Sequence, residues 1–474
     1  MTGKAETAFS YIDEKRGLIA RLSDEIWALA EVGLHEDKSS LALAQALKDE
    51  GFAVDLGVGD MPTALVATWG KGSPVIGFLG EYDALPGVSQ KACPTREELV
   101  IGGAGHGCGH NLLGAGAFGA VIGLKQEMLA KSLPGTIKFF GCPAEENFGG
   151  KAFMARAGLF ADCDACLTWH PGQVNQVRGS TSLAVSSMNI TFHGRTAHAS
   201  GDPYNGRSAL DAIMLTGMGV EFLREHMSAK ARIHYVITNG GSQPNVVPAK
   251  ATAWFYVRSP QHDEVEVLYQ RVLNCAYGAA QMTDTKCEVE LLDAIYNVIP
   301  NRVLEDLLEE SMKQVGPPVF GASDKEFAAK IAAGFEPGQK EVLFRSSGLP
   351  ESIKSQTLND TLVSRPQTPD EPKGSTDVGD VSWCCPTAQF GTACMALGTP
   401  GHSWQFTAQS GMGIGHAGMI AAAKILSDAG LRLLTGPETI AKAKAEFAAA
   451  TGGKAYKCAM PPEHMPPFHQ LGQK

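Results

Sequence analysis

The chain has 474 residues, of which 44% are hydrophobic and 19% charged, a composition typical of a folded globular protein and not of a disordered one. It carries 40 basic and 50 acidic side chains, and this net charge of −10 argues against a nucleic-acid-binding protein, which neutralises phosphates with basic residues. No apolar stretch approaches the roughly 20 residues that cross a bilayer, which argues against an integral membrane protein.

Strands and helices alternate over the first 182 residues. Residues 8–32 are expected to form one amphipathic helix, because Ile12, Ile19 and Ile26 fall on one face and charged residues fill the other. The further elements expected here are strands at 63–68, 75–79, 136–140 and 164–169 and helices at 111–130 and 149–160. This alternation predicts an α/β fold with a mostly parallel sheet that helices cover on both faces.

The pattern changes near residue 183. The expected order becomes β-α-β-β-α-β, with strands at 183–194, 232–238, 251–257 and 286–295 and helices at 206–227 and 261–282. This order is the split motif of a ferredoxin-like sandwich. We therefore expect an inserted α+β domain at 183–298 and a discontinuous first domain made of residues 1–182 and 299–474.

The rest of the first domain begins with an expected helix at 303–316. Residues 317–380 are rich in Pro, Gly, Ser and charged residues, and we interpret them as a long insertion or loop region. The elements expected after it are a strand at 392–398 and helices at 416–429 and 437–450. The tail from Thr451 is rich in Gly and Pro, and we expect it to be poorly ordered.

Two features indicate a cytoplasmic protein. The first residues contain no apolar core and no small-residue cleavage site, so they do not resemble a secretory signal. The eleven Cys are odd in number and scattered over the chain, unlike the dense cysteines of a disulfide scaffold. We expect most of them to be buried thiols in a reducing compartment.

The chemically informative residues stand in four short segments. These are GHGCGHN (105–111), CPAEEN (142–147), TWHPG (168–172) and GTPGHSW (398–404). Each follows an expected strand or lies in a Gly-rich connection, and strand carboxyl ends in an open α/β sheet meet at one edge. The residues that these segments bring to that edge are His106, Cys108, His110, Glu145, Glu146, His170 and His402.

These residue types suit a divalent metal ion. Imidazole and thiolate favour zinc, and added carboxylates also admit manganese, iron or cobalt. Glu145 and Glu146 point in different directions, so one can bind a metal while the other takes a proton from the attacking water. Asp83, in GEYDALPG (80–87), is placed to orient an imidazole ligand. Each residue alone is more simply a core or surface side chain, but several such segments at strand ends favour the metal site.

In this order, the segments GEYDALPG, GHGCGHN, CPAEEN, TWHPG and GRTAHAS (194–200) resemble those of the aminoacylase and carboxypeptidase-like metallo-amidohydrolases. The Cys-Gly-His sequence is similar to the branch that includes hippurate hydrolases and auxin-conjugate amidohydrolases. The opening helix, STDVGDVSW (375–383) and GTPGHSW resemble a narrower group, the aminobenzoyl-glutamate utilisation protein B-like amidohydrolases. The resemblance covers nearly the whole chain.

The resemblance implies a catalytic first domain with two divalent metal ions per subunit, manganese or zinc. The residues that match the family's ligands are Cys108, His110, Glu146, His170 and His402, and Glu145 matches its general base. Asp83 would assist catalysis beside them. The chain departs from the common branch at Asn111, where that branch has Asp. His416, in GIGHAGM, competes with His402 as the last ligand, although its place in an Ala-rich helix favours a structural role.

The resemblance also implies that the second domain is a lid and dimerisation domain. His198 matches the family's lid histidine, which reaches the site of a neighbouring subunit. Asn245 and Arg258 are candidates for binding a substrate carboxylate, a task that suits the bidentate guanidinium of Arg. The expected assembly is a homodimer, and a paralogous subunit as an additional partner stays open.

Our leading hypothesis is a metal-dependent amidohydrolase that cleaves N-acyl or N-aroyl amino acids. The favoured substrates are aminobenzoyl-glutamate-like or indoleacetyl-aspartate-like conjugates. One alternative is a metallo-dipeptidase, which would accept a free α-amine. Another is a non-catalytic partner subunit of a hetero-oligomeric hydrolase, which would require the loss of the base or of a ligand.

Overall fold

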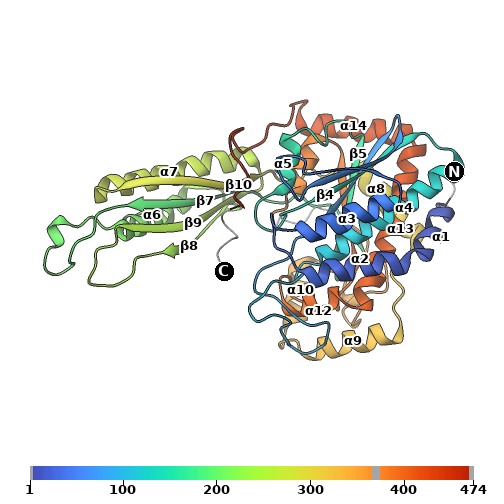
Figure 1. Cartoon of the computed structure of the whole chain (residues 1–474), viewed down its shortest axis with the longest axis horizontal. Helices are drawn as coiled ribbons and strands as arrows, with labels where there is room; N and C mark the ends of the chain where they lie inside the picture. Colours follow the sequence, from blue (N-terminus) through green and yellow to red (C-terminus); the bar gives the residue numbers. More distant parts are fainter. Residues whose placement is uncertain (1–3, 366–373, 469–474) are drawn as a thin grey trace.

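The computed structural model describes residues 4–365 and 374–468, which contain two β-sheets (Figure 1). The larger, central sheet has the strand order β1-β2-β4-β3-β5-β11-β6. Its strands are β1 (Ala53–Leu56), β2 (Leu65–Lys71), β3 (Val75–Glu81), β4 (Gly135–Cys142), β5 (Ala165–Gly172), β6 (Gln176–Arg178) and β11 (Thr387–Ala393). The four central strands β4, β3, β5 and β11 are parallel, which confirms the predicted α/β class.

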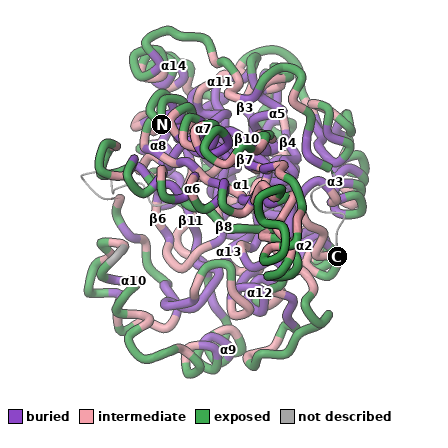
Figure 2. Tube along the Cα trace, turned by 90° about the vertical axis from the view of Figure 1, so that its left-hand side faces the viewer, coloured by how far each residue is buried: buried purple, intermediate pink, exposed green. Residues whose placement is uncertain are grey.

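Helices cover both faces of the central sheet because its strands are apolar on both sides. In β4, Phe139 packs into one core and the adjacent Phe140 into the other. The helices on the Phe139 face are α1 (Glu6–Glu14), α2 (Arg16–Leu29), α3 (Asp37–Asp49), α4 (His110–Lys131), α8 (Arg302–Val315), α13 (Gly413–Thr435) and α14 (Pro437–Thr451). On the Phe140 face lie α5 (Gly150–Arg156) and α11 (Val378–Cys384). Figure 2 shows the buried residues gathered in the interior and the exposed ones on the outer loops and helices.

Two predictions about element boundaries are wrong. The single helix expected at 8–32 is broken at Lys15 into α1 and α2, while Ile12 and Ile19 pack on Gly123 and Gly119 of α4, respectively. The strand expected at 392–398 ends at Ala393, although Cys394 to Leu397 are also fully buried. The apolar residues at 392–398 are buried, as their composition predicts, but only Thr392 and Ala393 belong to the sheet.

The second sheet lies within residues 184–295, which we call the small unit, and the other described residues form the large unit. Its strands are β7 (Ala184–His193), β8 (Arg232–Asn239), β9 (Lys250–Ser259) and β10 (Lys286–Ile295), in the antiparallel order β10-β7-β9-β8. Helices α6 (Ala209–Leu223) and α7 (His262–Thr283) pack on it around a separate core. The predicted β-α-β-β-α-β order is confirmed. The division into domains at 183 and 298 stays a prediction.

The segment 317–380 is not the loop region that its composition predicts. It contains α9 (Ala322–Ala333) and α10 (Gln339–Ser347), and Phe327 and Ile331 of α9 pack against Ile414. Glycines and prolines flank these short helices. The overall composition of the segment therefore resembles that of a loop, although each helix has an apolar face. Part of this prediction, residues 366–373, lies outside the described residues.

The expected disorder of the tail is also wrong for the residues up to 468. Tyr456 donates a hydrogen bond to Asp380 at 2.7 Å, and Met460 is buried in the core beside α5 and α11. Residues 469–474 lie outside the described part. None of the helices in residues 4–365 and 374–468 combines the length and apolarity that a bilayer crossing demands.

Candidate active site

Three neighbouring parallel strands deliver the site segments to one edge of the central sheet. β3 ends at Glu81, β4 at Cys142 and β5 at Gly172, and β3 pairs with both of the others. Helix α4 starts there at His110, and helix α12 (Trp404–Ser410) follows the GTPGHSW segment. The cavity at this edge has a volume of about 630 Å³, and its lining includes Cys108, Glu145, Glu146, His170 and His402.

Cys108 stands between two groups of possible metal ligands. With His110 and His170 it forms one group, and with Glu146 and His402 another, in each of which the ligand atoms lie within 4.8 Å of one another. The Cys108 Sγ is 3.4 Å from His170 Nε2, and His402 Nε2 is 3.5 Å from a carboxylate oxygen of Glu146. Each group would suit one divalent ion, and Cys108 belongs to both groups.

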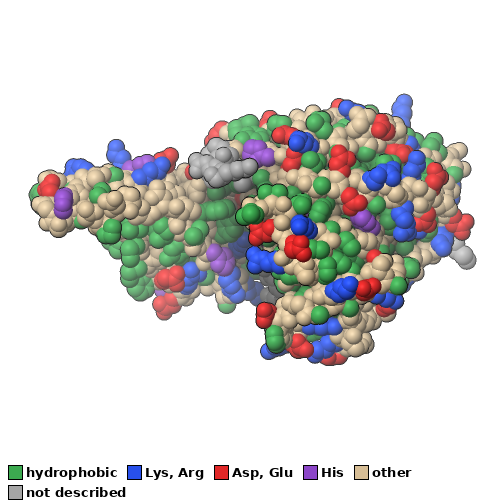
Figure 3. Space-filling model, turned by 60° about the horizontal axis from the view of Figure 1, so that its bottom comes forward, with side chains coloured by type: hydrophobic (Ala, Val, Ile, Leu, Met, Phe, Trp, Pro, Cys, Tyr) green, Lys and Arg blue, Asp and Glu red, His purple; other side chains and the backbone are tan. Residues whose placement is uncertain are grey.

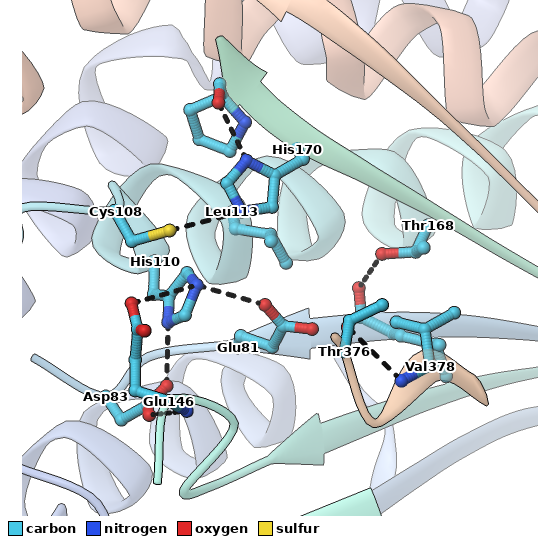
Figure 4. Close-up of polar contacts among 12 residues, drawn as sticks. Glu81, Asp83, Cys108, His110, Leu113, Glu146, Thr168, His170, Thr376 and Val378 are labelled. Atoms are coloured by element: carbon cyan, nitrogen blue, oxygen red, sulfur yellow. Dashed lines mark hydrogen bonds and ion pairs between the residues drawn. The ribbon is translucent and has the colours of Figure 1, made fainter. Parts of the chain in front are cut away.

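His110 is oriented by Asp83 (Figure 4). The His110 Nδ1 lies 2.7 Å from Asp83 Oδ1, and the other Asp83 oxygen accepts a hydrogen bond from the Glu146 N–H at 2.9 Å. The imidazole is thereby held with Nε2 facing the cluster, as expected of a metal ligand with a carboxylate behind it. Although burial opposes it, the charges of Asp83 and Cys108 raise the pKa of His110 well above 6.5.

Several atoms of the site lack the partners that buried polar atoms require. His110 Nε2 and Glu146 Oε1 are buried and make no hydrogen bond with the described residues. Burial, and then the charge of Glu146, raises the pKa of the Cys108 thiol to about 12, so a thiolate here needs a cation beside it. Leaving buried polar atoms without partners costs free energy. Bound divalent ions would provide partners for His110 Nε2 and Glu146 Oε1 and would stabilise the Cys108 thiolate. The residues therefore fit a metal centre.

Glu145 has the properties of a group that exchanges protons. It lines the cavity, and one of its oxygens lies within 4.8 Å of ligand atoms of Glu81 and His110. Burial, followed by the charges of Glu81 and Asp377, raises the pKa of Glu145 well above its ordinary value. A raised pKa lets a carboxyl group both accept and return a proton near neutral pH.

Two residues beside the site have the left-handed backbone conformation that non-glycine residues rarely adopt. Ala144 has φ 57° and His402 has φ 52°. The Ala144 N–H donates to the buried carboxylate of Glu36 at 2.8 Å, and the His402 N–H donates to the carbonyl of Gly107 at 3.1 Å. These bonds fix the backbone next to Glu145 and at His402. Strain of this kind persists where function requires a particular placement.

Three residues of the motif segments lie outside the cluster. His416 pairs with Asp24 at 2.8 Å on the outer side of α13, which leaves His402 as the histidine beside Glu146.

His106 is buried against the carbonyl of Ile26, and burial lowers its pKa to about 4. Asn111 donates to Ser23 and to the Ser410 carbonyl, so it ties α4 to α2 and α12.

The residues expected to bind substrate lie in the small unit and do not line the cavity. His198 and Asn245 are exposed neighbours, since the Ala199 N–H donates to the Asn245 carbonyl. They follow β7 and β8 at the end of the second sheet that points away from the large unit (Figure 1). Arg258, on β9, lies over the Tyr256 ring at 4.9 Å. Figure 3 shows that the molecule is hollowed between the two units.

Four residues of the site were not found from the sequence: Glu81, Lys151, Arg178 and Asp377. Glu81 had a usable signal, because it stands two residues before Asp83 at the end of a strand and so points the same way. Asp377 lies in the STDVGDVSW segment, but its chemistry depends on Lys151, a single lysine without a motif. Arg178 ends the short edge strand β6 and lines the cavity.

Replacing Cys108 by Ala is expected to lower metal occupancy and activity together. The change removes a ligand atom from both groups, and loss of even an outer partner of a metal ligand costs about 10–100-fold in affinity. Metal analysis of the folded variant, with its melting temperature, tests this expectation. A less stable protein with unchanged metal content would make Cys108 a core residue only.

Comparison with known proteins gives one family. A family model described as "Peptidase family M20/M25/M40" matches residues 77–351, more than half of the chain. The chain is 38% identical over 470 residues to one of the subunits of the "p-aminobenzoyl-glutamate hydrolase" of Escherichia coli (strain K12), and the match covers 95% of this chain and 96% of that protein.

Two further similarities bear on function and fold. The chain is 31% identical to "Xaa-Arg dipeptidase" of Mus musculus, over 64% of this chain and 70% of that protein. It superposes with a TM-score of 0.57 and 16% identity on a Bacillus subtilis structure described as a "Dinuclear Metal Binding Peptidase from M20 Family", covering 89% of this chain and 99% of that one. At that identity the match speaks for the fold alone.

Proposed function

This chain belongs to peptidase family M20/M25/M40, and from that premise we propose that it is a metal-dependent amidohydrolase of N-acyl or N-aroyl amino acids. The observation that carries the proposal is the cavity at the sheet edge, where Cys108, His170 and the Glu145–Glu146 pair face one another. A proton-accepting carboxyl next to unsatisfied ligand atoms is what metal-assisted amide hydrolysis requires.

The proposed ligands of two divalent ions, manganese or zinc, are Cys108, His110, Glu146, His170 and His402. Such ions supply Lewis-acid activation of the attacking water and of the amide oxygen. Glu145 takes the proton from the water and returns it to the nitrogen of the leaving amino acid. Asp83 keeps His110 in the tautomer that presents Nε2 to the site.

Arg178 supports an acidic amino acid as the leaving group. Arg178 lines the cavity, is exposed to solvent at the end of β6, and makes no ion pair with the described residues. His170 lines the same cavity, and burial, followed by the charge of Arg178, holds the pKa of His170 well below its ordinary value. The apolar Val174, Leu343 and Leu349 line the same cavity and suit an aryl group. Both features suit an aminobenzoyl-glutamate-like as well as an indoleacetyl-aspartate-like substrate. The similarity to the Escherichia coli relative leads us to favour the aminobenzoyl-glutamate-like one.

The similarity to an Xaa-Arg dipeptidase makes a dipeptidase the second candidate. Such a substrate brings a free α-ammonium group and a guanidinium into the cavity. The unpaired positive charge of Arg178 opposes that substrate and favours one with an extra carboxylate.

For the assembly and setting, we propose a homodimer in the cytoplasm. The Escherichia coli relative is named as one subunit of a hydrolase, which keeps a partner subunit as the alternative. The presence of Glu145 and all the expected ligands favours a chain that is active by itself. Of the eleven Cys, five are buried and six are only partly buried, so the expectation that most of them are buried is wrong.

Hydrolysis of p-aminobenzoyl-glutamate, its arginine analogue and unblocked dipeptides by the purified chain alone tests this function. We expect the glutamate conjugate to be cleaved best. Arg178→Met should lower kcat/KM for it by about 10- to 100-fold, because a hydrogen bond to a charged group contributes about 1.5–3 kcal/mol. For the arginine analogue, Arg178→Met should bring no loss. Preference for unblocked dipeptides would favour the dipeptidase, and no turnover by metal-loaded protein would favour the partner subunit.

A further inference from the structure

A lysine without contact with solvent lies beneath the metal-ligand cluster. The Lys151 Nζ is 2.6 Å from Glu81 Oε1 and 2.6 Å from Asp377 Oδ1, and all three side chains are buried. The Lys151 N–H also donates to the second oxygen of Asp377 at 2.8 Å. A buried charge is tolerated only when it is paired, so Lys151 and Asp377 hold the Glu81 carboxylate in one orientation.

The second oxygen of Glu81 faces the metal-ligand cluster. Glu81 Oε2 lies 3.2 Å from His110 Nε2, the ion-pair contact that Figure 4 marks with a dashed line, but the two atoms do not have the geometry of a hydrogen bond. His110 Nδ1 is engaged by Asp83, so Nε2 is the ring atom that faces the site, next to the oxygen of Glu81 that Lys151 does not bind. Two such atoms are expected side by side when both bind one cation.

The spacing of these two atoms suits a shared ion. Nitrogen and oxygen ligands at the usual bond lengths around a tetrahedral zinc ion lie roughly 3.3 Å apart. Ligand atoms of Glu81, His110 and Glu145 also form a group within 4.8 Å, which shares His110 with one of the two groups that contain Cys108. The ligands that the resemblance implies do not include Glu81.

We propose that Glu81 is a further ligand of the ion held by His110, and that Lys151 and Asp377 are positioning residues that aim its carboxylate. Lys151 takes up one oxygen of Glu81 and leaves the other for the metal. It also balances the negative charge that Glu81 adds beside Glu145 and Glu146. This inference rests on the metal centre of the proposed function.

Glu81→Gln is the first test, since it keeps the size of the side chain and removes its charge. The probes are manganese, zinc and cobalt ions added to the metal-free full-length protein. We expect at least about tenfold weaker binding of one of the two ions, by chelator competition. The visible absorption of the cobalt-loaded protein should also change, because it reports the ligands of the ion. Glu127→Gln is the matched control, since Glu127 is buried and paired with Lys131 away from the cluster, and it should keep both ions.

The triple variant Glu81→Leu/Lys151→Met/Asp377→Leu covers the case in which Glu81→Gln does not fold. Replacing a whole buried group of paired charges by apolar groups of similar size is often tolerated. Without the Glu81 carboxylate, the same ion should bind more weakly. If the folded variants bind both ions as tightly as the wild-type protein and show its cobalt spectrum, the inference about Glu81 is wrong and the proposed function is unaffected. If the wild-type protein binds no ions, both the inference and the proposed function are wrong.

Discussion

Glu145→Gln is expected to lower kcat by at least about 10²–10⁴-fold, the usual contribution of a general base. Glutamine fills the same space but cannot take a proton from the attacking water. Glu145 lies next to the metal-ligand group and not among the residues assigned as ligands, so both ions should stay bound. Steady-state kinetics on p-aminobenzoyl-glutamate, with metal analysis of the same preparation, measures both quantities.

Glu146→Gln provides the contrast for this prediction. Glu146 faces His402 and Cys108, so its loss should reduce metal content as well as activity. The base and the ligand are thus separated by the metal analysis, although they are adjacent in the chain. Near-normal turnover of Glu145→Gln with both ions bound would remove Glu145 from the role of base.

Two inactive variants, Glu145→Ala and His198→Ala, are expected to restore activity when they share a dimer. His198 lies at the end of the small unit that points away from the large unit, so we expect it to serve the site of a neighbouring subunit. In a mixed dimer, the site with intact Glu145 receives the intact His198 of the other chain. Random exchange makes about half of the dimers mixed, each with one working site, so about a quarter of the full activity should return.

This mixing experiment needs proof that the subunits exchange. The two variants carry different tags and are unfolded and refolded together. The refolded mixture is assayed for the expected quarter of full activity, and the mixed dimers isolated by tandem purification are assayed for about half. Refolding each variant alone gives the background. Mixed dimers with no more activity than that background would show that His198 does not act in a neighbouring site.

The placement of the site could be predicted from the sequence because it depends on local rules. Cys108, Glu145 and His170 follow or adjoin strand ends, and β3, β4 and β5 are neighbours, so their ends meet at the cavity. The contact of Asp83 with His110 is the one that its predicted orienting role requires. Similarly, the alternation of elements was enough to predict both sheets.

The parts that could not be predicted depend on contacts between distant residues. Lys151 and Asp377 are 226 residues apart, and Lys151 belongs to no motif, so the sequence does not show that the two side chains pair. Helix α9 is hidden in a polar composition, since only its packing on Ile414 shows what Phe327 and Ile331 do. The end of β11 at Ala393 depends on where the chain leaves the sheet, which an apolar run does not reveal.

The central claim is that this chain uses divalent ions to hydrolyse an N-acyl amino acid. Its most direct test is to remove metal with a chelator, return manganese or zinc stepwise, and follow the release of glutamate from p-aminobenzoyl-glutamate. The account predicts that hydrolysis disappears in the metal-free protein and returns fully only when two ions per chain are bound. Undiminished hydrolysis by protein whose metal-free state has been verified by mass spectrometry would contradict it.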